Sequence, residues 1–265
     1  MEPLALIAGN GSLPRIVCET AKSRGIPVVA VAFGAKAGQS LEGLADFKIM
    51  GIGEAEKVIS HFKDAGCKKL CLIGKIEKKL IFENIKLDMR TLKMMGRLIK
   101  KDDTTVMLAI IDELESEGFE IVKQTDWLPA LMPAAGVLGK IRPSDALKAD
   151  FEYGMKICRD MASMEIGQTV IVKDGVVLAV EAVEGTDAAI DRGCSLGGSG
   201  AVMIKTSRPN QDLRFDIPSV GSETVRRLAK NNAAALVVEA GRVVVVDLPE
   251  VISLCDTAGI ALVAI

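Results

Sequence analysis

The chain has 265 residues, of which 49% are hydrophobic, so it is long and apolar enough for one large or two small domains with real cores. Its net charge is −2, whereas nucleic-acid-binding proteins usually carry an excess of basic residues, so we expect no nucleic-acid partner. The opening MEPLALIAGNG has no basic leader, and no apolar run reaches the roughly 18 residues that span a bilayer, which favours a cytoplasmic protein.

The cysteines and the histidine argue against zinc and against serine–histidine catalysis. The six cysteines show no CxxC spacing, and His61 is the single histidine. We therefore expect the thiols to be reduced core residues and His61 to lie on the surface. Any chemistry is then expected to rest on carboxylates, a lysine or a hard metal ion.

Strands and helices alternate through the first half of the chain. Apolar runs and the amphipathic stretches between them predict, in order, strand 4–8, a helix from 13, strand 27–34, helix 54–66, strand 68–76, helix 104–118 and strand 119–128. This alternation is typical of a parallel sheet with crossover helices. The fold class predicted is therefore α/β, with a Rossmann-like parallel-sheet domain over residues 1–135.

Three prolines and two glycines at 128–145 indicate a linker, and a second domain is predicted over residues 136–265. Its expected elements are helix 144–163, a hairpin turning at KDG, a helix from 186, strand 201–207, helix 222–232 capped by Ser222, strands 235–241 and 242–248 paired with each other, helix 247–259 and strand 260–265. This order predicts an α+β domain with a mixed sheet.

Two loops of the first domain are candidates for phosphate binding. Gly9, Asn10 and Gly11 fall between a strand and a helix, where backbone N–H groups can cradle a phosphate, although a tight βα turn explains them equally well. Pro14 replaces the third glycine of a dinucleotide motif, and the second strand ends in AFG without an acid. Both features argue against a dinucleotide site.

Gly74 and Lys75 follow the third predicted strand, at the sheet edge where ligands of open α/β sheets collect. Lys75 could contact a phosphate or remain a solvated lysine. In KKDDTT, Asp102 or Asp103 could simply cap the next helix, or that helix could direct its positive N-terminus to an anion.

The stretch VEAVEGTDAAIDRG, residues 180–193, places several acids after an apolar run. Within a strand over 176–183 both faces are otherwise apolar, so Glu181 would be buried and needs a partner. Gly185 ends the strand, and Thr186 or Asp187 can cap the following helix. Asp187 and Asp191 then share one helical face. The cluster could hold a metal or substrate, or form a solvated acidic surface.

A second acidic stretch, QDLRFDIPSVG at 211–221, is predicted to be an irregular loop. Asp212 and Asp216 stand four residues apart with Arg214 between them, and the glycine-rich SLGGSG precedes the segment. Loops that hold fixed polar groups often carry function.

These motifs together resemble the LpxI-type UDP-2,3-diacylglucosamine pyrophosphatases. The similar segments are LIAGNGSLP, KDDTTVMLAI, EIGQTVIVKDGVVLAVEAVEGTDAAIDR and QDLRFDIPSVGSETV, and they extend over essentially the whole chain. The resemblance implies hydrolysis of UDP-2,3-diacylglucosamine to UMP and 2,3-diacylglucosamine 1-phosphate in Gram-negative lipid A biosynthesis. It also implies Mg²⁺ or Mn²⁺, water attack at the α-phosphorus, and a ligand enclosed between two domains.

On this resemblance, Asp216 is expected to be the essential acid, with Asp212 its competitor. The metal ligands are expected among Glu181, Glu184, Asp187 and Asp191. The substrate-binding residues are expected among Gly9, Asn10, Gly11, Gly74, Lys75, Asp102, Asp103, Gln168, Thr186, Lys205, Gln211 and Arg214. The expected partner is an acylated UDP-sugar, with peripheral contact at the inner membrane and a homodimer also compatible. The alternatives are a non-catalytic nucleotide-sugar-binding regulatory module and hydrolysis of another nucleotide diphosphate.

Overall fold

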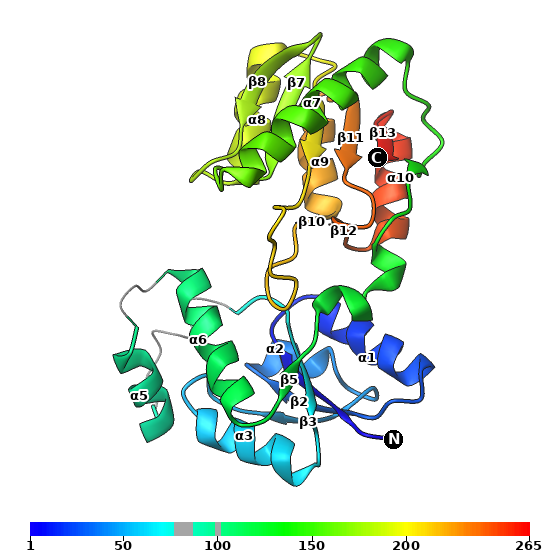
Figure 1. Ribbon diagram of the computed structural model, residues 1–265. Coiled ribbons are helices and arrows are strands. Elements are labelled where there is room, and N and C mark those ends of the chain that lie inside the picture. Colours follow the sequence, from blue (N-terminus) through cyan, green and yellow to red (C-terminus); the bar gives the residue numbers. More distant parts are fainter. Residues whose placement is uncertain (77–86, 99–101) are drawn as a thin grey trace. The chain divides into compact units, whose positions relative to one another are not determined.

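The computed structural model divides the chain into two compact units (Figure 1). It describes residues 1–76, 87–98 and 102–265. Unit 1 comprises Met1–Leu128 together with Leu213–Phe215, and unit 2 comprises Pro129–Asp212 together with Asp216–Ile265. The chain therefore enters unit 2 after Leu128 and returns to unit 1 for three residues.

Unit 1 is built on a parallel sheet with the strand order β3-β2-β1-β4-β5. The strands are β1 (Leu4–Ala8), β2 (Val28–Ala32), β3 (Asp46–Ile49), β4 (Lys69–Ile73) and β5 (Glu120–Ile121). The described helices are α1 (Leu13–Ser23), α2 (Ala35–Gln39), α3 (Ala55–Asp64), α5 (Met89–Gly96) and α6 (Asp103–Ser116). This order and direction confirm the predicted Rossmann-like parallel sheet.

Apolar composition explains the centre of this sheet, and polarity explains one element that the pattern missed. All five residues of β1 are buried, as expected for a strand covered on both faces. β3, with the sequence DFKI, lies at the sheet edge and is largely exposed, so it carries no apolar run that would reveal it.

The predicted strand 119–128 is wrong beyond Ile121. The chain leaves the sheet there and forms the 3₁₀ helix η1 (Gln124–Trp127). Buried Gln124 causes the departure, because its side-chain amide donates to the carbonyl of Leu72 and its backbone N–H donates to the carbonyl of Leu213 over 2.8 Å. The next bond of the ladder would join the backbone N–H of Gln124 to the carbonyl of Leu72, and both groups have these other partners instead.

Unit 2 contains a mixed sheet with the strand order β6-β13-β11-β9-β7-β8. The strands are β6 (Gly136–Val137), β7 (Thr169–Lys173), β8 (Val176–Val180), β9 (Val202–Lys205), β11 (Ala235–Val238) and β13 (Ala261–Ala264). β9, β11 and β13 are parallel, whereas β7 runs antiparallel to β8 and β9, and β6 antiparallel to β13. The remaining elements are η2 (Pro129–Leu131), α7 (Asp145–Ser163), α8 (Thr186–Gly197), α9 (Ser222–Lys230), α10 (Leu248–Ala258) and the strand pair β10 (Ser219–Val220) and β12 (Val244–Val245). The predicted mixed-sheet α+β class is confirmed.

Alternation along the strands assigns each face of this sheet to different helices. Ile171 and Met203 pack in one core with residues of α8, α9 and α10. Their neighbours Val172 and Ile204 pack in another core with Phe151 and other residues of α7. The period of two residues in a strand therefore separates one helix on one face from three on the other.

Three local predictions for unit 2 are wrong. β11 pairs with β9 and β13, while β12 pairs with β10, because the chain turns after Glu239 and the N–H of Val243 bonds the carbonyl of Glu239. α9 begins at Ser222 with Gly221 as its N-cap, so Ser222 is not the cap. β8 is an edge strand that ends at Val180 and is only partly buried, rather than covered on both faces.

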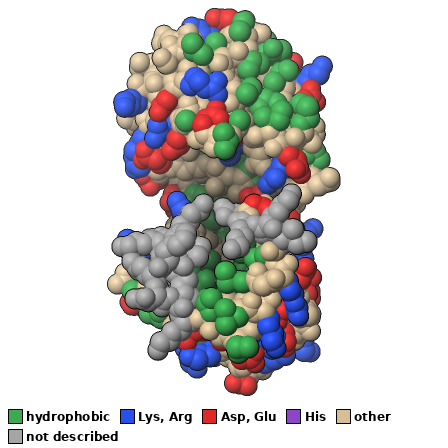
Figure 2. Space-filling model, turned by 90° about the vertical axis from the view of Figure 1, so that its left-hand side faces the viewer, with side chains coloured by type: hydrophobic (Ala, Val, Ile, Leu, Met, Phe, Trp, Pro, Cys, Tyr) green, Lys and Arg blue, Asp and Glu red, His purple; other side chains and the backbone are tan. Residues whose placement is uncertain are grey.

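All six cysteines are buried and form no disulfide, as expected. Among the described helices, none combines the length and the apolar character that a membrane span requires. On the face shown in Figure 2, basic and acidic side chains are interspersed, and hydrophobic side chains gather in one area of unit 2.

Candidate functional site

Polar side chains of unit 2 converge where β7 begins and where β8 and β9 end. The register pairs Thr169 with Lys205 and Val170 with Val180, which brings the residues just beyond these strands together. A pocket of about 230 Å³ opens here, which we call the polar pocket. It is lined by Glu165, Ile166, Gly167, Gln168, Glu181, Ala182, Lys205 and Arg208.

Lys205 is the buried cation of this pocket. It is the last residue of β9, and only 6% of it is exposed. Its Nζ donates to the hydroxyl oxygens of Thr169 at 3.1 Å and Thr186 at 3.0 Å, and lies 3.8 Å from Oε2 of Glu181. Burial lowers the pKa of Lys205, and the negative charge of Glu181 offsets part of that effect.

Glu181 has the partners that its predicted burial demands, which confirms that expectation. Its carboxylate accepts from the Thr186 hydroxyl at 2.6 Å and from the backbone N–H of Gln168 at 3.3 Å, besides facing Lys205. Burial alone would raise the pKa of Glu181, but attraction to Lys205 and these hydrogen bonds outweigh it and lower the pKa. Glu181 therefore stays ionised at neutral pH.

Gly167 allows this close arrangement. A Cβ atom at Gly167 would lie 2.0 Å from the carbonyl oxygen of Glu181, so a larger residue would push the start of β7 away from the end of β8. Gln168, the next residue, is thereby held against the Glu181 carboxylate. The glycine of the sequence EIGQ is therefore a packing requirement of the site.

The same hydrogen-bonded chain continues into the QDLRFD segment. The side-chain amide of Gln168 donates to Oε1 of Gln211 over 2.7 Å. The side-chain amide of Gln211 in turn donates to the carboxylate of Asp216 over 2.5 Å and to its carbonyl over 2.9 Å. The guanidinium of Arg208 also bonds the Asp216 carboxylate. We call the connected set the polar network: Gln168, Thr169, Glu181, Thr186, Lys205, Arg208, Gln211 and Asp216.

Thr169, Arg208 and Glu239 belong to this region but were not predicted. Glu239 follows β11, is 7% exposed, and accepts from the Thr206 hydroxyl and from the backbone N–H of Ser207 at 3.2 Å. It thus holds the segment that leads from Lys205 to Arg208. An acid directly after the apolar run ALVV is the same signal that identified Glu181, so it could have been found.

The four acids predicted as metal ligands do not converge. Glu184 pairs with Arg192 at 2.6 Å, whereas Asp187 and Asp191 both pair with Arg227, the former at 3.4 Å. The shared arginine confirms that Asp187 and Asp191 occupy one face of α8. Within the described ranges, no group of three or more His, Cys, Asp or Glu residues could hold a metal ion. The four acids therefore do not fit as joint ligands of one ion.

The glycine loops of unit 1 lie together at the carboxyl ends of β1 and β4. A Cβ atom at Gly9 would lie 2.6 Å from the carbonyl carbon of Gly74, and Asn10 and Lys75 exchange two backbone hydrogen bonds of 2.8 Å. The N–H of Gly9 is bonded to the carbonyl of Ile73. Close backbone packing thus explains both glycines. The backbone N–H groups of Gly9, Asn10 and Lys75, which belong to the proposed phosphate cradle, already donate to carbonyl groups of the protein. Phosphate binding by this loop, Gly11 included, stays a prediction.

The other predicted residues of the first half have local roles. Asp102 caps α6, because its carboxylate accepts from the backbone N–H of Thr105 at 2.9 Å. Asp103 is the first residue of α6, and its side chain lies outside the described part of the structure. Arg214 pairs with Glu115 of α6 at 2.8 Å within unit 1. The carbonyl of Asp212 accepts from the N–H of Asp216 over 3.0 Å. Substrate contacts by these residues stay predictions.

Comparisons with solved structures give only partial overlaps. N5-carboxyaminoimidazole ribonucleotide synthetase from Thermotoga maritima is 17% identical and covers 64% of this chain and 38% of its own, with a TM-score of 0.25. Glycinamide-RNase-transformylase T from Mycobacterium tuberculosis is 14% identical and covers 68% and 44%, with a TM-score of 0.25. Likeness at this level bears on neither fold nor function.

Sequence comparison is decisive about the family. The LpxI N-terminal domain profile matches residues 3–131, and the LpxI C-terminal domain profile matches residues 134–263. A curated protein of Caulobacter vibrioides, the UDP-2,3-diacylglucosamine pyrophosphatase LpxI, is 33% identical over an alignment of 271 positions, which covers 98% of this chain and 96% of that protein. The chain therefore belongs to the LpxI family.

Proposed function

We propose that the chain hydrolyses the pyrophosphate bond of UDP-2,3-diacylglucosamine, releasing UMP and 2,3-diacylglucosamine 1-phosphate. Membership of the LpxI family and the activity named for its Caulobacter relative support this reaction. The structural observation that carries the proposal is the polar network, which gathers the cations Lys205 and Arg208 and the acid Asp216 at one edge of the unit 2 sheet.

The two cations suit a diphosphate. Both line the polar pocket, and the ammonium of Lys205 is almost fully buried. A positive charge acts more strongly on a phosphate in such a site than in bulk water, because less water screens it. Lys205 would act as a point charge, and the forked guanidinium of Arg208 would bond two oxygens. In the proposed complex both offset the charge that develops on the leaving phosphate.

Asp216 is the proposed base for water. In the proposed step, a water oxygen attacks the α-phosphorus, its proton passes to the Asp216 carboxylate, and the bond from that phosphorus to the bridging oxygen breaks. The sugar phosphate leaves with the bond's electron pair. Hydrogen bonds from Gln211 and Arg208 fix the carboxylate, which favours a constant position for the water.

A divalent cation remains part of the proposal, without an assigned ligand set. Mg²⁺ is usually held by one or two carboxylates together with substrate phosphates, so it does not require a preformed cluster of acids. Bound beside the diphosphate, Mg²⁺ or Mn²⁺ would supply additional positive charge. No step of the proposed reaction is assigned to the ion, because the four predicted acids are separately paired.

The products test the reaction directly. Purified protein incubated with UDP-2,3-diacylglucosamine in H₂¹⁸O should release UMP that carries the label, because water attacks the α-phosphorus. Mass spectrometry of both products locates the oxygen. Label in the sugar phosphate would contradict attack at the α-phosphorus. Saturable binding of the substrate without any UMP would instead support the non-catalytic nucleotide-sugar-binding module.

Substitution of Asp216 tests the assigned base. Asp216→Asn keeps the shape of the side chain but removes its basicity, so kcat should fall by roughly 100-fold or more while substrate binding survives. Asp160→Asn, on the exposed side of α7, removes the same charge outside the polar network and should leave kcat within about twofold. Asp212→Asn is the competing variant. Near-normal turnover by Asp216→Asn together with an inactive Asp212→Asn would transfer the role to Asp212.

The lowered pKa of Lys205 predicts how kcat/KM depends on pH. A lysine loses its positive charge as the pH rises through its pKa, and burial lowers that pKa below the ordinary 10.5. The alkaline limb of kcat/KM should therefore have its midpoint below pH 10.5. Lys205→Arg, which stays charged, should move that limb upward by about one pH unit or more. The control is Lys156→Arg, a substitution at an exposed position. If the alkaline limb of kcat/KM is the same in Lys205→Arg as in the unaltered protein, Lys205 does not contribute to substrate binding.

Removal of divalent cations tests the metal proposal. Activity should disappear in excess EDTA and return when Mg²⁺ or Mn²⁺ is added beyond the chelator, since the ion offsets charge on the diphosphate. The UMP assay measures both the loss and the return of activity. The control is a sample that receives Mg²⁺ before the EDTA is added. Full activity after rigorous chelation would leave Lys205 and Arg208 as the sole source of positive charge in the proposal.

A further inference from the structure

Glu239 is an almost fully buried carboxylate that no step of the proposed reaction uses. It follows β11, only 7% of it is exposed, and it is not among the residues that line the polar pocket. A buried carboxylate is costly unless other groups pair with it, so its partners indicate what it does. These partners surround the backbone of Arg208, one of the two cations proposed to bind the diphosphate.

Glu239 holds the chain on the amino-terminal side of Arg208. Its Oε2 accepts from the Thr206 hydroxyl and from the backbone N–H of Ser207 at 3.2 Å. Its own backbone N–H donates to the carbonyl of Lys205 over 3.0 Å. The three residues before Arg208 are therefore all attached to the residue that follows the neighbouring strand β11.

Arg242 holds the chain on the carboxyl-terminal side of Arg208. Its Nη2 donates to the carbonyl oxygen of Arg208 over 3.0 Å, and its Nε lies 3.7 Å from Oε2 of Glu239. Oε1 of the same carboxylate accepts from the guanidinium of Arg159 on α7, over 3.0 Å from Nε and 2.9 Å from Nη2. The Glu239 carboxylate thus lies between two guanidinium groups, and one of these contacts Arg208 directly.

Glu239 is ionised and already occupied by the protein. Burial alone would raise its pKa, but hydrogen bonds from Thr206, Ser207 and Arg159 outweigh that effect and lower the pKa. The carboxylate is therefore negative at neutral pH and attracts both guanidinium groups. Because both of its oxygens accept from donors of the protein, a positioning role is favoured over a contact with substrate.

Arg208 is a residue for which exact placement matters. Its backbone N–H and its Nε both donate to Oε1 of Gln211 over 3.2 Å, and its Nη2 bonds the Asp216 carboxylate. These contacts require the backbone of Arg208 to stay in one place. A guanidinium bonds two phosphate oxygens only in a fixed orientation, and a displacement of roughly 1 Å can cost about 100-fold in rate.

We propose that Glu239, assisted by Arg242, is a positioning residue that aligns Arg208 with the diphosphate of the substrate. It contributes to turnover without touching substrate, because it fixes the backbone on both sides of Arg208. The inference rests on the proposed function, and specifically on phosphate binding by Arg208.

Glu239→Gln and Arg242→Gln test the two contacts. In Glu239→Gln an amide oxygen can still accept from the N–H of Ser207, but the charge that attracts Arg159 is lost. The value of kcat/KM for UMP release should fall about tenfold or more. Arg242→Gln should lower it about threefold, because this half-exposed side chain makes one hydrogen bond to the segment. Glu152→Gln, at an exposed position of α7, is the matched control and should stay within about twofold.

A double-mutant cycle with Arg208→Gln separates positioning from a general loss of stability. If Glu239 acts through Arg208, then Glu239→Gln should lower kcat/KM by less than about twofold once Arg208→Gln is present. Equal reductions in the two backgrounds would mean that Glu239 only stabilises the fold, and would overturn the inference. It would also be overturned if Glu239→Gln and Arg242→Gln both keep kcat/KM within about twofold of the unaltered protein.

The same cycle measured as affinity for UDP requires no turnover. By isothermal titration calorimetry, Glu239→Gln should weaken UDP binding about fivefold or more, and this effect should disappear in the Arg208→Gln background. If the unaltered protein releases no UMP, the proposed reaction fails and the UDP measurement alone decides the inference. Absence of UDP binding, or equal affinity of Arg208→Gln and the unaltered protein for UDP, would then overturn it.

Discussion

The buried ammonium of Lys205 is the constraint on which the polar network depends. Only 6% of this lysine is exposed, and an unpaired buried charge costs several kcal/mol. Glu181, Thr169 and Thr186 provide the compensation. Removal of one partner from a buried pair typically destabilises by roughly 3–5 kcal/mol, so the lysine and the glutamate require each other.

The same constraint connects structure to the proposed chemistry. Glu181 is held by Lys205, Thr186 and the N–H of Gln168, and the Gln168 side chain then reaches Gln211. Gln211 in turn fixes Asp216. The charge that is proposed to bind the diphosphate is thereby the first member of a chain of contacts that also positions the proposed base. Such pre-organisation favours catalysis, because the polar groups need not reorient when charge develops on the substrate.

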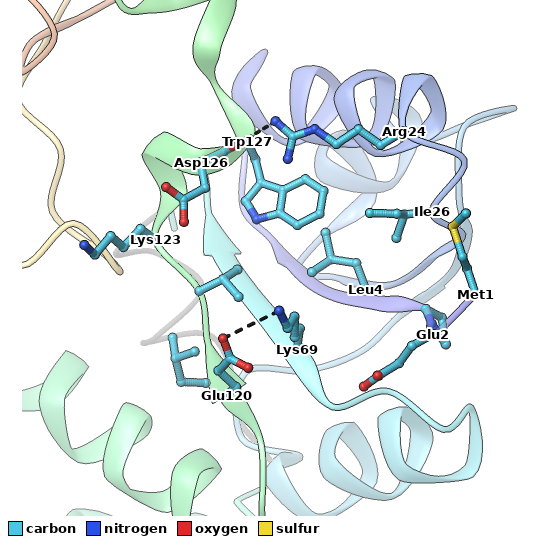
Figure 3. A pocket seen from close by; sticks show the side chains of 13 residues that line it. Met1, Glu2, Leu4, Arg24, Ile26, Lys69, Glu120, Lys123, Asp126 and Trp127 are labelled. Atoms are coloured by element: carbon cyan, nitrogen blue, oxygen red, sulfur yellow. Dashed lines mark hydrogen bonds and ion pairs between the residues drawn. The ribbon is translucent and has the colours of Figure 1, made fainter.

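The sheet of unit 2 is the rigid frame for this arrangement. The ends of β8, β9 and β11 and the start of β7 lie side by side, so Glu181, Lys205 and Glu239 come to one edge from distant parts of the chain. Glu239 binds the Thr206–Ser207 segment and thereby fixes the position from which the Arg208 side chain extends. In unit 1, tight packing of Gly9 against Gly74 fills the sheet edge where β1 and β4 end, whereas a pocket lies at the edge where these two strands begin (Figure 3).

The sequence alone determined the parallel sheet of unit 1, the mixed sheet of unit 2 and the need of Glu181 for a partner, because apolar periodicity and burial of charge are local signals. Only the tertiary structure decided that this partner is Lys205, and that Asp187 and Asp191 are paired with Arg227 rather than gathered with Glu181. It also decided that β11 pairs with β9 and β13, and that Gln124 ends β5. These outcomes depend on strand register and on contacts between residues far apart in the chain, and a local pattern contains neither.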